Sequence, residues 1–268
     1  MKFDSPFVDF RVRWQPPRRP SSHAIGSRLP ATLPHVLVLL LGLALAGCGS
    51  ASRTGAGYAD RPPTDKVALI AWQEWSKFGR ATVVYGGQAN GYTNRPGVTE
   101  RSEPLASRVG EYWGACGKPE WNGRTSSKPW SGAFVSWVMA RAGYTPQQFP
   151  RDGRHGSYLS TLYDREKNRG APFYLHSPSE YSPKPGDLIC TGSSGPTWRH
   201  ADPRTAHRRI DNTANHCDIV TGVRGGYVQA IGGNVKNSVA MSLYPVDSRG
   251  RLQSVSGRPW LLVVEKKF

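Results

Sequence analysis

The order of two repeat patterns along the chain constrains its fold more than any other feature of the sequence. Between residues 64 and 142, apolar residues recur at spacings of three and four, which is typical of amphipathic helices. From residue 183 onward, apolar runs of strand length alternate with turn signals such as PKPG, RGG and DSRG. Helices followed by strands predict an α+β fold in which N-terminal helices pack on a mostly antiparallel β-sheet.

The same patterns predict the individual elements. Helices are expected over about 64–78, 105–116 and 131–142, with a shorter one within 155–169. Asp65 can cap the first helix, and a glycine follows each of the first three. Strands are expected at 187–190, 217–223, 227–233, 238–246 and 259–268, whereas residues 80–103 are polar and rich in turn residues.

The first 47 residues have the pattern of a signal peptide. A basic, proline-rich stretch precedes an apolar run from Val36 to Gly47, which is too short to span a membrane as a helix. The ending Leu-Ala-Gly before Cys48 resembles a bacterial lipobox, in which the cysteine carries the lipid. We therefore expect a signal peptide at 1–47, a lipidated Cys48 with a flexible tether to residue 63, and a single domain over 64–268. An uncleaved anchor or a buried helix is the alternative.

Charge and location together narrow the class of partner. The chain has a net charge of +16, which becomes +12 once residues 1–47 are removed. An exported basic protein meets acidic groups in the cell envelope, including peptidoglycan peptides and lipid head groups. Gly49 after the lipidated cysteine weakly favours an anchor in the outer membrane, facing the periplasm. No nucleic-acid motif is present, so we expect no nucleic-acid partner. We also expect no cofactor.

Three cysteines remain after Cys48. Cys190 and Cys217 lie in two strand-like runs and are the preferred disulfide pair in an oxidising compartment, which leaves Cys116 free.

Three polar residues stand where a hydrolase would need them. Ser131 begins a predicted helix, where the helix dipole and free N–H groups favour a nucleophile and a developing oxyanion. His216 opens a predicted strand and can act as a base, and Asn234 follows a later strand and can orient the imidazole ring.

The sequence motifs around these residues resemble those of a known superfamily. PWSGAFVSWVMARAG, PKPGDLIC, NHCDIVTGV and IGGNV occur in the order found in CHAP-type and NlpC-type amidohydrolases and peptidases, and the resemblance spans about 105–243. It is closest to an uncharacterised family of bacterial lipoproteins within that group, with an Ala-Trp-x-Glu-Trp helix at 71–75 and a Tyr-Trp pair at 112–113. The resemblance implies a papain-like fold and a Cys–His mechanism on peptidoglycan amide bonds.

Carried over by position, the resemblance makes Ser131 the nucleophile, His216 the base and Asn234 the orienting residue. Trp130 and Gly132 would line the cleft or supply oxyanion donors. His155, in GRHGSY, could also line the cleft, with a place on a surface loop as the alternative. Serine replaces the family's cysteine, and a hydroxyl cannot ionise as a thiol does. We therefore expect a non-catalytic or weakly active binder of peptidoglycan or envelope peptide, with a serine-nucleophile amidase or peptidase as the alternative.

Other roles stay open for the same residues. Ser131 can be a helix N-cap, His216 a core histidine, and Asn234 a turn residue. Cys116 could replace the missing thiol in space. A metal site could draw on other polar side chains, but their spacing matches no zinc pattern, and we expect none; the residues considered are His200, His207, His216, Cys217 and Asp218.

Overall fold

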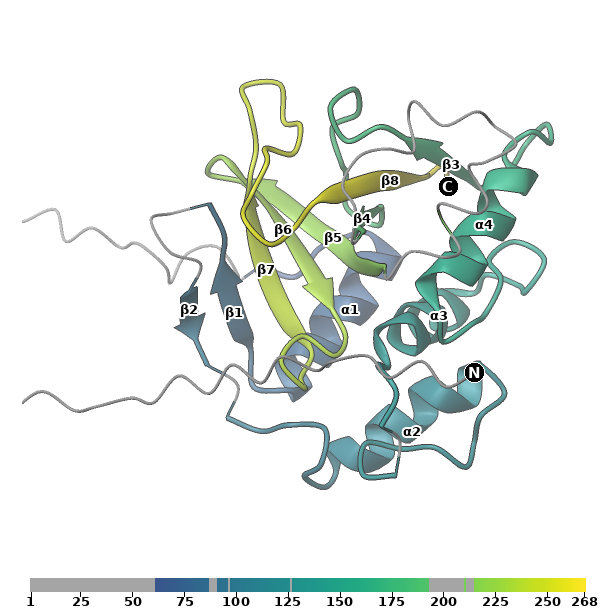
Figure 1. Ribbon diagram of the computed structural model, residues 1–268, viewed down its shortest axis with the longest axis vertical. Helices are drawn as coiled ribbons and strands as arrows, with labels where there is room; N and C mark the ends of the chain where they lie inside the picture. The colour runs from purple at the N-terminus through teal and green to yellow at the C-terminus, as the bar shows by residue number, and fades with distance from the viewer. Residues whose placement is uncertain (1–60, 87–90, 96, 126, 193–209, 211–214) are drawn as a thin grey trace, which may run out of the picture. The chain divides into compact units, whose positions relative to one another are not determined.

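The computed structural model describes residues 61–86, 91–95, 97–125, 127–192, 210 and 215–268. The expected signal peptide, Cys48, His200 and His207 lie outside these residues. The described residues all belong to one compact unit (Figure 1).

The described residues form four helices and eight strands, so the predicted α+β class is confirmed. The helices are α1 (Lys66–Lys77), α2 (Leu105–Ala115), α3 (Ser131–Ala142) and α4 (His155–Arg165). The strands are β1 (Ala81–Val84), β2 (Gly91–Asn94), β3 (Phe173–His176), β4 (Leu188–Thr191), β5 (His216–Arg224), β6 (Tyr227–Gly232), β7 (Ala240–Pro245) and β8 (Trp260–Lys266). No helix among the described residues is long and apolar enough to cross a membrane.

The strands form a single sheet in the order β2-β1-β7-β6-β5-β4-β8-β3. Every neighbouring pair is antiparallel except β1 and β7, which run parallel. Strands β1, β2 and β3 were not predicted from the sequence. They are only four residues long and lie at or near the two edges of the sheet, where the apolar pattern is weakest.

Both faces of the central strands are buried. Helices α1 and α3 pack against β5 and β6, and α2 packs on α3 (Figure 1). The opposite face carries a second apolar cluster, to which the segment after β7 adds Leu252 and Val255. Burial on both faces explains why β4, β5 and β6 read as continuous apolar runs instead of alternating ones.

A buried ion pair joins the first two helices. The Glu74 carboxylate on α1 accepts bonds from Arg108 Nε and Nη2 at 2.7 Å each and from the Tyr112 hydroxyl at 2.6 Å. Burial by itself would raise the pKa of Glu74, but Arg108, Lys77 and Tyr112 together lower it. The carboxylate therefore stays ionised inside the helical layer. The cap of α1 agrees with the sequence, since Asp65 accepts a bond from the Ala68 N–H at 3.0 Å.

Candidate functional site

Two helix N-termini meet at the candidate site. Ser131 is the first residue of α3, and His155 is the first residue of α4. A side chain at Gly132 would place its Cβ 2.3 Å from the Gly153 carbonyl oxygen, so only glycine permits this approach. The close contact between the two segments brings Ser131 and His155 within reach of each other.

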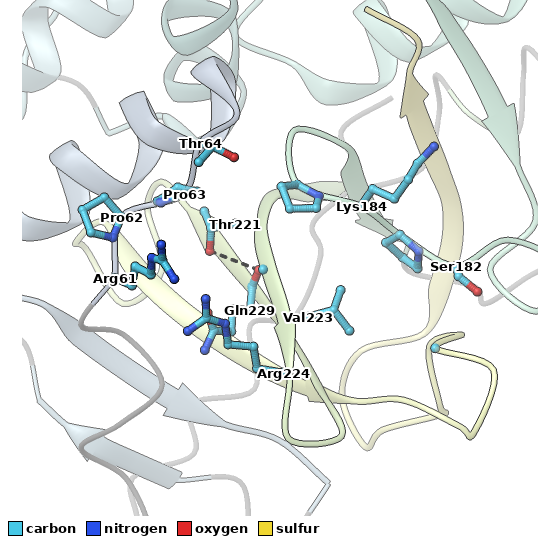
Figure 2. A pocket seen from close by; sticks show the side chains of 14 residues that line it. Arg61, Pro62, Pro63, Thr64, Ser182, Lys184, Thr221, Val223, Arg224 and Gln229 are labelled. Carbon is cyan, nitrogen blue, oxygen red and sulfur yellow. Dashed lines mark hydrogen bonds between the residues drawn. The ribbon is translucent and has the colours of Figure 1, made fainter.

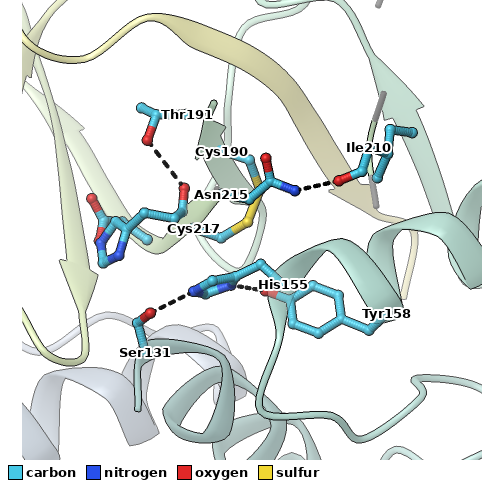
Figure 3. The surroundings of a disulfide bond; sticks show 10 residues. Ser131, His155, Tyr158, Cys190, Thr191, Ile210, Asn215 and Cys217 are labelled. Atoms are coloured by element: carbon cyan, nitrogen blue, oxygen red, sulfur yellow. Dashed lines mark hydrogen bonds and ion pairs between the residues drawn. A yellow bond between two sulfur atoms is a disulfide. The ribbon is translucent and has the colours of Figure 1, made fainter. Parts of the chain in front are cut away.

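Ser131 is bonded to His155 and does not cap its own helix. Its Oγ lies 2.7 Å from His155 Nε2, and the N-cap position of α3 belongs to Trp130, which makes no side-chain capping bond (Figure 3). On the other side of the imidazole ring, His155 Nδ1 lies 2.5 Å from the Tyr158 hydroxyl. Tyr158 follows His155 by three residues, so the helix geometry places both side chains on one face of α4.

Burial determines which groups donate and which accept in this chain of hydrogen bonds. Tyr158 has no exposed surface and His155 has 4%, whereas Ser131 retains 6%. Each ring nitrogen of His155 faces one hydroxyl group, Nδ1 that of Tyr158 and Nε2 that of Ser131. We infer that the Tyr158 hydroxyl donates to Nδ1, because Tyr158 is fully buried and a buried donor left unsatisfied would be costly. The proton of the neutral ring is then on Nε2, and this N–H donates to Ser131 Oγ.

The environment also keeps His155 uncharged. Burial, reinforced by the neighbouring His216, lowers the pKa of His155 to about 3, although Asp218 acts in the opposite direction. A general base must take up a proton and carry the resulting charge near neutral pH. In the described conformation, His155 is therefore a poor proton acceptor for the Ser131 hydroxyl.

A second histidine has the carboxylate partner that His155 lacks. His216 Nε2 lies 2.7 Å from Asp218 Oδ1, and the Tyr244 hydroxyl donates to Asp218 Oδ2 at 2.9 Å. Burial alone would raise the pKa of Asp218, but the charge and hydrogen bond of His216, together with Arg258 and Tyr244, lower it to about 2. Asp218 thus remains ionised and holds the His216 ring in one orientation.

The two histidines are in contact, which corrects the expected pairing of the site. Their ring centroids are 5.6 Å apart with planes at 64°. Ser131 was expected to bond to His216, but its hydrogen-bond partner is His155. Asn234 was expected to orient His216, but Asp218 does so, because residues two apart on a strand share one face.

Glycines hold the turn after β6 against this arrangement. A Cβ at Gly232 would lie 1.8 Å from Asp218 Oδ1, and one at Gly233 would lie 2.5 Å from the Cβ of Phe134 on α3. Trp130 is only 2% exposed and donates from Nε1 to Glu100 at 2.8 Å. It belongs to the hydrophobic core, and its role in lining a cleft stays a prediction. The role of Gly132 as an oxyanion donor stays a prediction.

His216 opens onto a pocket of about 560 Å³, which we call the His216 pocket. Asn234 lies on its wall, so the structure does bring these two predicted residues together. The other polar and aromatic residues of the wall are Tyr85, Tyr92, Lys236, Ser256 and Arg258. Two cationic side chains and two tyrosines therefore surround the exposed edge of His216.

The disulfide between Cys190 and Cys217 lies beside the site (Figure 3). The two cysteines are opposite each other on β4 and β5, and Cys217 directly follows His216. This is the pair preferred from the sequence. Cys116 is a free thiol whose pKa burial raises to about 11, and its hydrogen-bond partner is Ser136. A protonated thiol at that position does not replace a nucleophile at residue 131.

Another pocket of about 560 Å³ lies away from these residues (Figure 2). Arg61, Lys184 and Arg224 contribute charge to its wall, and the backbone carbonyl of Gln229 accepts a bond from the Thr221 hydroxyl at 3.2 Å. None of the predicted site residues lines this pocket.

Sequence reasoning missed three contributors to the site: Asp218, Tyr158 and Tyr244. The spacing of His216 and Asp218 on a predicted strand, and of His155 and Tyr158 on a predicted helix, carried a signal for the first two. Tyr244 comes from β7, and its contact with Asp218 has no local signal. Among the described residues, no group of His, Cys, Asp and Glu could hold a metal ion.

The family follows from a comparison with known protein families. Residues 100–265 match the model of an uncharacterised protein family conserved in bacteria, DUF2272. The match covers more than half of the chain. The chain belongs to this family. The family region contains Ser131, His155, His216, Asp218 and the whole of α3 and α4. No curated protein and no solved structure matches the chain.

Proposed function

We propose that this member of the DUF2272 family is a lipid-anchored envelope protein that binds peptidoglycan or envelope peptide in the His216 pocket without efficient hydrolysis. The expected signal peptide and lipidated Cys48 support an exported protein, and the order of the sequence blocks supports a papain-like ancestor. The anchor is proposed to lie in the outer membrane.

One observation carries the non-catalytic part of this proposal. The two ring nitrogens of His155 lie 2.5 Å from the Tyr158 hydroxyl and 2.7 Å from Ser131 Oγ. With the buried Tyr158 hydroxyl as donor to Nδ1, Nε2 carries the ring proton and donates to Ser131. A base for Ser131 would need the opposite polarity, with Nε2 free to accept the hydroxyl proton. Burial adds to the obstacle, because it lowers the pKa of His155 to about 3.

The binding part of the proposal depends on the His216 pocket. His216 keeps 21% of its side chain exposed and is held in place by Asp218. The tyrosines of the pocket offer aromatic surface, and Asn234 together with the pocket cations offers hydrogen bonds to peptide groups. A site of this kind can hold a peptide even where its nucleophile has been lost.

A serine-nucleophile amidase or peptidase is the second candidate, and the contact between Ser131 and His155 favours it. In that reaction, Ser131 Oγ would attack the amide carbonyl while its proton moved to His155, and the first N–H groups of α3 would stabilise the oxyanion. The ring would first have to transfer its proton from Nε2 to Nδ1. Asp218 would stabilise the charged imidazolium nearby, whereas His216 would oppose the charge.

The test combines sedimentation with fragment analysis. The purified protein is incubated with isolated peptidoglycan, the pellet is assayed for bound protein, and the supernatant is analysed by mass spectrometry. We expect the wild type and Ser131→Ala to co-sediment equally and to release no fragments. Fragments released by the wild type but not by Ser131→Ala would establish the hydrolase instead.

A matched pair of histidine variants locates the binding. His216 and His176 are both strand residues whose Nε2 pairs with a carboxylate, at 2.7 Å to Asp218 and 2.8 Å to Glu265 respectively. Only His216 lines the pocket. His216→Gln is expected to reduce co-sedimentation, whereas His176→Gln is expected to leave it unchanged. Equal effects of the two substitutions would place the binding surface elsewhere.

A further inference from the structure

The turn after β6 holds an unusual backbone at the edge of the His216 pocket. Val235 and Ser238 exchange two backbone hydrogen bonds, at 3.0 and 3.2 Å, and so enclose a two-residue turn. The two central residues, Lys236 and Asn237, have positive φ angles of 52° and 61°. This is the pattern of a type I′ turn, which strongly prefers Asn followed by Gly.

Lysine is a poor residue for the first central position of such a turn. Glycine adopts positive φ without steric cost. In lysine, Cβ crowds the carbonyl oxygen, and the side chain lacks the local hydrogen bond by which asparagine tolerates this conformation. Strained backbone of this kind clusters at sites that contact ligands. The turn is also held from outside, because the Glu100 N–H donates to the Asn237 carbonyl oxygen at 2.9 Å.

The position of Lys236 indicates a function for this strained turn. The residue is exposed, it lines the His216 pocket, and no carboxylate pairs with it in the part of the chain that the structure describes. Arg258 adds a second positive charge to the wall, where its Nη2 donates to the Tyr85 hydroxyl at 3.0 Å. Among the described residues, no acidic side chain lines the pocket. The ionised Asp218 interacts with Arg258, so Lys236 is the cation of the wall without an acidic neighbour among these residues.

We propose that the His216 pocket recognises a carboxylate on its peptide ligand, and that Lys236, held outward by the strained turn, binds this carboxylate. The ammonium group supplies a charge-assisted hydrogen bond, and Arg258 makes the wall electropositive from its place on Tyr85. This inference rests on the proposed function and names the chemical group that the pocket selects. Lys236 is a specificity-determining residue in this scheme.

The experiment compares two forms of one ligand. Isolated peptidoglycan is used untreated or after carbodiimide coupling to ammonia, which converts its carboxylates to amides. We expect the wild-type protein to sediment with the untreated wall at about fivefold lower protein concentration, as for a partly exposed ion pair. The preference should shrink as salt is added, because salt screens exposed charges.

Four variants separate the charge from the turn. Lys236→Asn keeps a residue that tolerates positive φ but removes the charge, so it should lose the preference for untreated wall. Lys236→Arg should retain the preference. Asn237→Gly is the matched control, because it relaxes the neighbouring position and should leave binding unchanged. Lys236→Gly should raise the thermal midpoint by about 2–4 °C while losing the preference.

The outcomes distinguish the inference from the proposal beneath it. Equal sedimentation of the wild type with both walls, or a preference that survives in Lys236→Asn, would overturn the role of the carboxylate while leaving peptidoglycan binding in place. Sedimentation with neither wall would overturn the proposed function and this inference together. A stabilised Lys236→Gly that binds as the wild type does would show that the strained turn serves no ligand.

Discussion

His155 should make the folded protein sensitive to acid over a defined range of pH. Its pKa is about 3 in the folded state, against an ordinary value of 6.5 in the unfolded chain. Between these two values the unfolded state binds a proton that the folded state does not, so the free energy of unfolding falls as the pH falls. The linkage relation gives a loss of about 2 kcal/mol between pH 7.5 and pH 5.0.

The perturbation that isolates this effect is His155→Gln. Glutamine does not titrate, and its amide can still donate to Ser131 Oγ and accept from the Tyr158 hydroxyl. Every other histidine is common to the two proteins, so their difference reports on residue 155. The free energy of unfolding is measured by urea denaturation of both proteins at pH 7.5 and pH 5.0, with the disulfide kept oxidised.

We expect the wild type to lose about 2 kcal/mol more than His155→Gln over this interval. Equal losses in the two proteins would show that His155 is not held neutral by burial. In that case the Ser131 hydroxyl would face a competent base, and the argument against hydrolysis would fail.

Two further substitutions test the supports of the site. Gly232→Ala places a methyl group 1.8 Å from Asp218 Oδ1, so it should lower the free energy of unfolding by about 1–3 kcal/mol. The same substitution should reduce co-sedimentation with peptidoglycan. A variant as stable as the wild type and with full binding would contradict the close approach. Glu74→Gln removes the charge that pairs with Arg108, so urea denaturation should show a loss of about 3 kcal/mol. A loss below about 1 kcal/mol would mean that the carboxylate is not buried with its partners.

Much of the helical layer could be predicted because its signals are local. Apolar spacing lies within each helix, Asp65 directly precedes α1, and a glycine follows each of the first three helices, so the helices were predicted within a few residues. The first strand of the sheet was not predicted, because Ala81–Val84 is short and pairs in parallel with Ala240–Pro245 far along the chain. Such a pairing has no signature in the four residues themselves.

The candidate site, like the fold, was predicted only in part from the sequence. The sequence singled out Ser131, His216 and Asn234, and the structure places His216 and Asn234 on one pocket. It assigned Ser131 to the wrong histidine, because the sequence gives no account of how α3 and α4 meet. That meeting depends on the contact of Gly132 with Gly153, twenty-one residues apart, and on what surrounds both helices.

The sequence by itself determined the four helices, five of the eight described strands, the preferred disulfide pair and the residue types available for chemistry. These follow from periodicity, turn residues and the location expected for an exported chain. Only the tertiary structure decided what those residues can do. It places His155 in the interior between Tyr158 and Ser131, and it leaves His216 partly exposed with Asp218 as its partner. Burial determines which hydroxyl must donate to the His155 ring and how costly a charge on that ring would be.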